Sequence, residues 1–227
     1  MMVEEMTAGR IVDVNESGVL TIKANAPSLD RALIRKYQDC TIILNDGRHI
    51  TPEQRRKVYA LLGEIDEYVS GIRTAGGVEE QKNFLKIEFM LHRMSDAERK
   101  MFSLADCSVT TAREFITFVI DFILANDIPT RFPLMEQCED IGRYVYACLV
   151  NKKCAICGRK CDLHHVDQVG MGNNRNEVHH LGRRALPLCR EHHTEIHTIG
   201  LKAFTAKYHI ESVEIDKKIC KLNLLKE

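Results

Sequence analysis

The chain has 227 residues, of which 44% are hydrophobic and 28% charged, and its formal net charge is zero. This composition is that of a globular protein, long enough for one large domain or two small ones. It excludes a helical membrane protein, because no run approaches the roughly 20 apolar residues that cross a bilayer. The acidic start, MMVEEMTAGR, lacks the apolar segment of a secretory signal, so we expect a cytoplasmic protein with no membrane partner.

Charge and histidine are concentrated in the C-terminal third. Residues 151–208 hold ten Lys or Arg against five Asp or Glu, and eight of the ten histidines lie between His164 and His209. The first 150 residues are correspondingly acidic. A basic, histidine-rich part behind an acidic part predicts two functional units, of which the second faces a polyanion.

The N-terminal residues predict short strands and one helix. The stretch RIVDVNESGVLTIKANA predicts two strands around the turn NESG. Residues 28–37 predict a short helix capped by Ser28, and residues 40–50 predict a strand followed by a turn.

Four helices are expected to follow. The first is capped by Thr51, has Pro52 at its first position, and has Gln54 to complete a capping box. It ends at Gly71 and presents one apolar stripe of Val58, Leu61, Leu62, Ile65 and Val69. Residues 71–80 read as a mobile loop before a second helix, VEEQKNFLKIEFMLHRM.

The third and fourth helices complete the N-terminal unit. TTAREFITFVIDFILANDIP has Thr111 and Glu114 as a capping box, with an apolar stripe of Phe115, Val119, Phe122 and Ile123. LMEQCEDIGRYVYACLVNKK leads directly into Cys154. The fold class is therefore α+β. We expect an N-terminal α+β domain over residues 1–150, a second domain over 151–210 and a C-terminal tail over 211–227.

Two cysteine-containing pairs predict a structural zinc site. Cys154 and Cys157 form C-x-x-C, and Cys189 and His192 form C-x-x-H about thirty residues later. Such pairs supply four ligands for one tetrahedral zinc ion. Free buried thiols are the alternative, but they do not explain the pairing. Cys161 lies close enough to replace one of the four.

Four more histidines surround these pairs. His193 and His197 are four residues apart, so they share one face of a helix and can chelate one ion. His164 and His165 are adjacent, so on a strand they point to opposite faces. A lone histidine is ordinarily a surface or core residue, but four in this arrangement favour a functional site.

The pattern C-x-x-C…HH…LC-x-x-HH-x-x-x-H resembles the HNH endonucleases, or ββα-metal nucleases, braced by a zinc knuckle. It is especially similar to those encoded by phages and prophages, and the resemblance covers residues 154–208. It implies that His164, His193 and His197 hold a catalytic divalent ion such as Mg²⁺, Mn²⁺, Ni²⁺ or Zn²⁺. It also implies that His165 is the general base and that DNA is the substrate, inside a bacterial host cell.

One position departs from that family's pattern. The middle Asn normally stands about nine residues before the first His of H-x-x-x-H, where this chain has Arg184. Either another residue orients His165, or the domain is a weak or inactive nuclease. The candidates for the missing role are His179, His180, Asn173, Asn174 and Asn176. The basic residues that could contact phosphates are Arg175, Arg183 and Arg184, with a solvated basic loop as the alternative.

Residues 41–65 resemble part of the lambda-type NinB recombination proteins. The resemblance implies binding of single-stranded DNA or of single-strand-binding protein during phage recombination. Arg55, Arg56 and Lys57 could touch phosphate there, although the solvated face of an amphipathic helix is the favoured interpretation. The acidic balance of this half argues against a broad DNA-coating surface.

Two functional hypotheses follow. The first is a metal-dependent HNH endonuclease that hydrolyses DNA phosphodiester bonds in phage or prophage recombination or DNA processing. The alternative is a recombination mediator that binds DNA or single-strand-binding protein through a zinc-stabilised module without cleaving. A purely structural zinc module would leave the extra histidines unexplained.

Overall fold

The computed structural model describes residues 9–25, 34, 42, 47–93, 101–166 and 179–225. These residues form helices and two small antiparallel sheets, so the predicted α+β class is confirmed. They belong to two compact units, one containing the N-terminal hairpin and one beginning at Gly47. Within the described residues, no helix is both long enough and apolar enough to span a membrane.

The N-terminal hairpin consists of β1 (Gly9–Val14) and β2 (Leu20–Ala24), which pair antiparallel as predicted. The side-chain carbonyl of Asn15 accepts hydrogen bonds from the backbone N–H groups of Ser17 and Val19, at 3.1 and 2.8 Å. Gly18 has a φ of +82°, which glycine adopts at little cost, and this closes the turn. The helix expected over residues 28–37 and the strand expected from residue 40 fall almost entirely outside the described residues.

Helix α2 (Pro52–Ser70) begins and ends where the sequence predicts. Thr51 and Gln54 exchange the two hydrogen bonds of a capping box, each at 3.1 Å, and Gly71 closes the helix in the left-handed conformation. Four positions of the predicted stripe, from Val58 to Ile65, are fully buried. The prediction for Val69 is wrong: its side chain is 64% exposed, because the whole last turn of the helix is open to solvent.

Helix α3 (Ala75–Arg93) begins inside the segment that we expected to be a loop, so that expectation is wrong. The cause is a contact with α2. The buried carboxylate of Asp66 accepts a hydrogen bond from the backbone N–H of Thr74 at 2.8 Å and so orders the turn before α3. Gly77 permits this approach, since a Cβ there would lie 1.9 Å from the Asp66 carboxylate oxygen.

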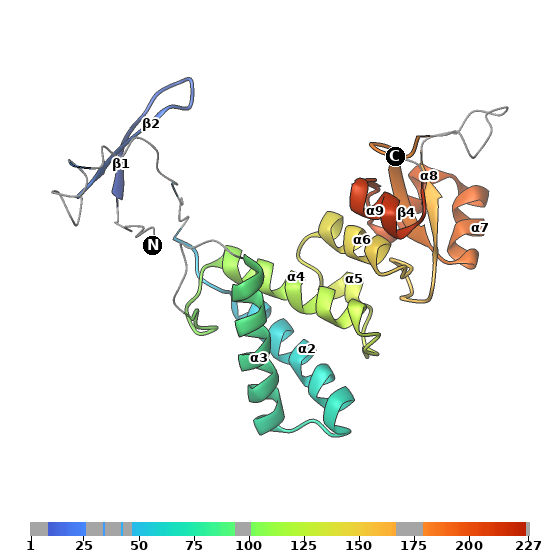
Figure 1. Cartoon of the computed structure of the whole chain (residues 1–227), viewed down its shortest axis with the longest axis horizontal. Coiled ribbons are helices and arrows are strands. Elements are labelled where there is room, and N and C mark those ends of the chain that lie inside the picture. The colour runs from blue at the N-terminus through green and yellow to red at the C-terminus, as the bar shows by residue number, and fades with distance from the viewer. Residues whose placement is uncertain are drawn as a thin grey trace. The chain divides into compact units, whose positions relative to one another are not determined.

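Helix α4 (Val109–Ala125) packs on α2 and α3 (Figure 1). Its cap is Ser108, whose hydroxyl accepts from the backbone N–H of Thr111 at 3.0 Å, so the predicted capping box of Thr111 and Glu114 is wrong. Ser108 has a hydroxyl group, as Thr111 does, but lies three residues before it. At Ser108 the backbone also forms a β-bridge with His49. The predicted apolar stripe does face the core.

The run expected as one helix forms two. Helix α5 (Leu134–Gln137) ends at Cys138, and α6 (Ile141–Val150) starts afresh because the side chain of Asp140 accepts from the backbone N–H of Arg143. Helix α6 also ends at Val150, before the first cysteine pair. A continuous helix into Cys154 is therefore a wrong prediction.

The C-terminal part is a small sheet covered by helices. Strands β3 (Asp162–His165), β4 (Arg184–Leu188) and β5 (Val213–Glu214) lie in the order β3-β4-β5. Helices α7 (Arg190–Ile199), α8 (Leu201–Tyr208) and α9 (Lys217–Leu222) complete it (Figure 1). The segment expected as a tail supplies β5 and α9, and its Ile215 and Ile219 are fully buried.

Helix α6 connects the helical part to the sheet. It packs against α4 on one side and against β4, β5 and α9 on the other. One buried cluster runs from Ile120 of α4 through Val145 of α6 to Leu186 of β4. The hydroxyl of Tyr144 donates a buried hydrogen bond to the carbonyl of Ala155 at 3.0 Å, so α6 also holds the segment that carries the first cysteines.

We expect Tyr144→Phe to lower the free energy of unfolding by about 1–3 kcal/mol, because the buried Ala155 carbonyl loses its donor. Tyr146→Phe is the matched control. It removes an exposed hydrogen bond to Asp216 and should cost no more than about 1 kcal/mol. Urea unfolding followed by circular dichroism measures both variants. Equal losses would contradict the assigned role of Tyr144.

Candidate metal centres

The first cysteine pair lies on a tight turn. The backbone N–H of Cys154 donates to the carbonyl of Arg159 at 2.7 Å, and the N–H of Gly158 donates back to the carbonyl of Cys154 at 2.8 Å. Gly158 has a φ of +69°, which favours glycine at this position. The turn places the sulfurs of Cys154 and Cys157 on the same side, facing the start of α7.

Four side chains converge there: Cys154, Cys157, Cys189 and His192, whose ligand atoms all lie within 4.8 Å of one another. The sulfurs of Cys157 and Cys189 are 3.7 Å apart, and the Cys154 sulfur is 3.5 Å from Nδ1 of His192. Zinc–ligand bonds of about 2.3 Å to sulfur and about 2.0 Å to nitrogen give tetrahedral edges of about 3.8 and 3.5 Å. The quartet therefore has the ligand chemistry and the dimensions of a zinc site.

Cys161 lies beside this quartet without joining it. It is buried against Cys154 and Cys189, but its sulfur is not among the four clustered ligand atoms. The geometry thus favours the original four residues over any set that includes Cys161.

The sequence reading missed Arg159, which faces the quartet. Its Nε donates to the Cys157 sulfur at 3.3 Å, while another of its nitrogens bonds Glu191 at 3.0 Å. Burial alone would raise the pKa of Cys157, but hydrogen bonds with Arg159, Cys154 and Cys189 together outweigh it and lower that pKa. Arg159 therefore favours the thiolate at Cys157. A basic residue two positions after the cysteine pair was the only available signal.

A second cluster joins β3 to α7. His164 on β3 is 9% exposed, and its ring centroid lies 4.7 Å from that of His193 and 5.1 Å from that of His197 on α7. One nitrogen from each ring lies within 4.8 Å of the others. Burial, followed by the two neighbouring imidazoles, lowers the pKa of His164 to about 4. It is therefore neutral near pH 7 and has a lone pair available for a divalent ion.

His165 points away from this cluster, as the alternation of a strand requires. Its Nε2 lies 2.7 Å from Nδ1 of His180, a residue of the segment that leads into β4. The pKa of His180 is lowered, first by burial and then by the nearby charge of Arg183. Arg183 is held there by a 2.8 Å hydrogen bond from its Nε to the carbonyl of His179.

Arg184, at the position of the Asn in the HNH pattern, makes two hydrogen bonds to Ser212. Its Nε donates to the Ser212 hydroxyl at 2.8 Å, and a terminal nitrogen donates to the Ser212 carbonyl. The guanidinium thus ties β4 to the segment before β5. The other candidate residues from the loop, Arg175 and the three asparagines, lie outside the described residues.

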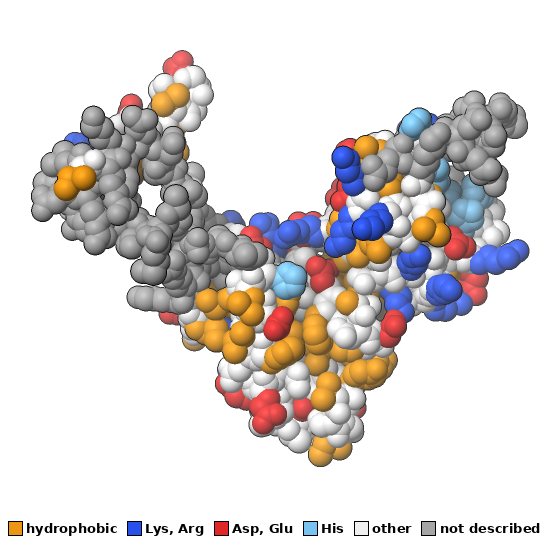
Figure 2. All heavy atoms as spheres, viewed as in Figure 1, with side chains coloured by type: hydrophobic (Ala, Val, Ile, Leu, Met, Phe, Trp, Pro, Cys, Tyr) orange, Lys and Arg blue, Asp and Glu red, His pale blue; other side chains and the backbone are white. Residues whose placement is uncertain are grey.

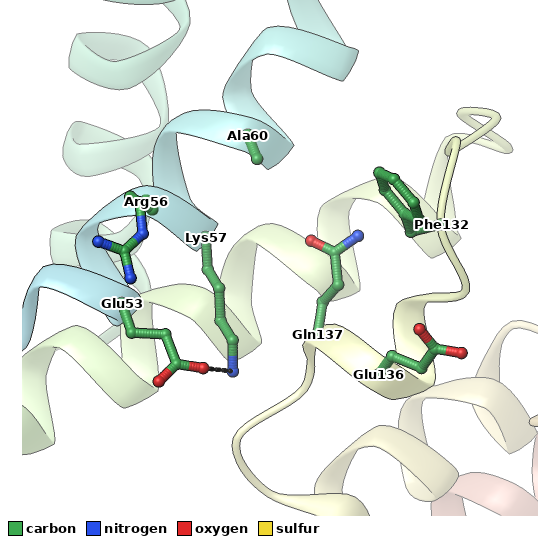
Figure 3. Close-up of a pocket in the computed structure, with 7 residues that line it drawn as sticks. All are labelled: Glu53, Arg56, Lys57, Ala60, Phe132, Glu136 and Gln137. Carbon is green, nitrogen blue, oxygen red and sulfur yellow. Dashed lines mark ion pairs between the residues drawn. The ribbon is translucent and has the colours of Figure 1, made fainter.

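The basic residues at the start of α2 make contacts within the chain. Arg55 donates to the carbonyl of Ala105, and Lys57 pairs with Glu139 at 2.7 Å and with Glu53 at 3.8 Å. A shallow pocket beside them mixes acidic and basic side chains (Figure 3). These contacts favour the interpretation of this surface as an ordinary polar helix face.

A family model described as "Putative HNHc nuclease" matches residues 26–226. The chain belongs to this family. The match extends well beyond the cysteines and histidines, so the helical part is included with the sheet and α7. No curated protein and no solved structure shows a significant match. The resemblance of residues 41–65 to NinB proteins finds no support in these comparisons and stays a prediction.

We expect Cys157→Ser to lose the zinc that the purified protein holds and to unfold the C-terminal part, because a structural zinc contributes on the order of 10 kcal/mol to folding. Cys161→Ser is the matched control and should keep about one zinc per chain. Elemental analysis and thermal unfolding measure both. If Cys161→Ser lost zinc and Cys157→Ser kept it, Cys161 would be the zinc ligand and Cys157 would not.

Proposed function

We propose that this HNHc family member is a metal-dependent endonuclease that hydrolyses phosphodiester bonds in DNA. The observation that carries the proposal is the cluster of His164, His193 and His197, with His165 next to it on β3 but turned outward. A purely structural site has no use for a second cluster with another imidazole adjacent to it on the strand. A hydrolytic site needs both an ion and a base.

The three clustered histidines would hold the catalytic ion, whether Mg²⁺, Mn²⁺, Ni²⁺ or Zn²⁺. When bound, such an ion stabilises the charge that develops on the phosphate and on the leaving oxygen. Neutral imidazoles leave the ion its full charge, and the low pKa of His164 keeps that ligand neutral. The proposed zinc at Cys154, Cys157, Cys189 and His192 would fix the start of α7, and with it the two helical ligands.

His165 would act as the general base. As a water oxygen bonds to phosphorus, a nitrogen of His165 takes the water proton, and the bond from phosphorus to the 3′ oxygen breaks. The leaving oxygen then gains a proton from solvent, which gives a 3′ hydroxyl and a 5′ phosphate. Imidazole suits this step because its ordinary pKa lies near neutrality.

The charge of the second unit supports a polyanionic substrate. Lys and Arg side chains gather over its C-terminal part on the face drawn in Figure 2, whereas hydrophobic side chains are most visible over α2 to α4. We propose that Arg175 and Arg183 contact phosphates beside the scissile bond. Arg184 is exposed but bonded to Ser212, and its predicted contact with phosphate stays a prediction.

A second candidate function is a mediator of phage or prophage recombination that binds DNA or single-strand-binding protein without cleaving. The observation that favours it is Arg184, which stands at the position of the Asn in the HNH pattern and whose guanidinium bonds to Ser212. The zinc quartet and the basic surface would serve this function equally well. Cleavage therefore has to be measured.

We expect the protein to nick supercoiled plasmid or single-stranded circles in the presence of Mg²⁺, Mn²⁺ or Ni²⁺. His165→Ala should slow nicking by roughly 100-fold or more, since a general base contributes about that much, yet still fold and bind metal. The matched control is His92→Ala, an exposed ring on α3 that packs at a tilt against Phe118. An inactive wild-type protein would favour the mediator, and equal nicking by His165→Ala would refute the assigned base.

Arg183→Gln should weaken DNA binding and reduce the slope of log K against log salt concentration by about 1, the value for one phosphate contact. Both proteins carry His165→Ala so that the substrate stays intact during fluorescence-anisotropy titrations. Arg131→Gln, which removes a pair with Glu67 of α2, is the control for a general loss of charge. Unchanged salt dependence in Arg183→Gln would exclude this contact.

A further inference from the structure

The proposed nuclease function needs a residue that orients His165. In the HNH pattern an Asn has this role, but this chain has Arg184 at that position. A base that takes a proton at one nitrogen must carry its hydrogen on the other, and a partner must accept that hydrogen. We propose that His180 is this partner, a positioning residue that holds His165 so that Nδ1 is the nitrogen that takes the proton from water.

The contact between the two rings links the tautomer of His165 to that of His180. Nε2 of His165 and Nδ1 of His180 are 2.7 Å apart, and the ring centroids are 4.7 Å apart. Two nitrogens at this distance share one hydrogen, so one must donate and the other accept. With Nε2 of His165 engaged by His180, we assign the proton from water to Nδ1.

Only one of the two arrangements is productive. If His165 donates from Nε2, its Nδ1 carries a lone pair and can accept the proton. If His180 donates instead, the hydrogen of His165 sits on Nδ1 and the base is blocked. In the productive arrangement His180 accepts both before and after proton transfer, and afterwards its hydrogen bond stabilises the imidazolium of His165.

Chemistry also explains why Arg184 cannot take this role. A guanidinium has five N–H donors and no acceptor, so it cannot receive a hydrogen bond from His165. Its donors are directed at Ser212. His180 offers a lone pair instead, and burial together with the charge of Arg183 favours its neutral form.

The first test reads the tautomer of His165 directly and needs no cleavage. Long-range ¹H–¹⁵N spectra of histidine-labelled protein, assigned with His165→Gln, should show the Nε2–H form in the wild type. His180→Leu should give a mixture of both forms. His180→Asn should restore the Nε2–H form, because an asparagine carbonyl lies where Nδ1 of histidine lies. A His165 tautomer unchanged in His180→Leu would overturn the proposal whether or not DNA is cleaved.

The second test measures nicking. His180→Leu should lower kcat by roughly 10–100-fold, as loss of a supporting hydrogen bond does at metal sites, with KM and zinc content unchanged. His180→Asn should recover most of kcat, and His179→Leu should match the wild type. A wild-type protein that does not nick would overturn the nuclease function, whereas an active His180→Leu would overturn only the role of His180.

Discussion

The first turn of α7 is the element on which both candidate metal centres depend. Cys189 occupies the N-cap position, and the N–H of His193 donates to its carbonyl at 2.8 Å as the first hydrogen bond of the helix. The Cys189 side chain makes no capping hydrogen bond, because its sulfur faces the Cys157 sulfur and His192. A metal at this quartet would therefore replace the usual side-chain cap. It would fix the rotation of the helix, and so the direction of His193 and His197.

The period of the helix and the alternation of the strand then direct neighbouring histidines to different sites. On α7, the adjacent residues His192 and His193 point about 100° apart, so one faces the cysteines and the other faces β3. On β3, the adjacent residues His164 and His165 point to opposite faces, so one is buried with α7 and the other meets His180. In the proposed function, two pairs of neighbouring histidines would thus serve a folding site, an ion site and a base. Each assignment follows from which face of a short element the side chain occupies.

Local signals predicted what local physics determines, and tertiary contacts account for the failures. The caps of α2 and the strands around the turn at Asn15 follow from residues within a few positions of one another. The start of α3 could not be predicted, because Asp66 of another helix orders the turn before it. The ligand pairs could be predicted because the C-x-x-C and C-x-x-H spacings are themselves typical of residues that bind one zinc ion. His180 was one of five candidates for orienting His165, but the sequence could not select it, since a long segment separates the two histidines.

Arg184 shows why one substitution need not remove a function. An asparagine side chain can both accept and donate, whereas arginine can only donate. An arginine at this position must therefore find acceptors, and it finds them at Ser212, where it ties β4 to the segment before β5. In the proposed function, His180 would meet the need of His165 for an acceptor through their 2.7 Å contact. The arginine would then support the sheet, and the second imidazole would support the proposed base.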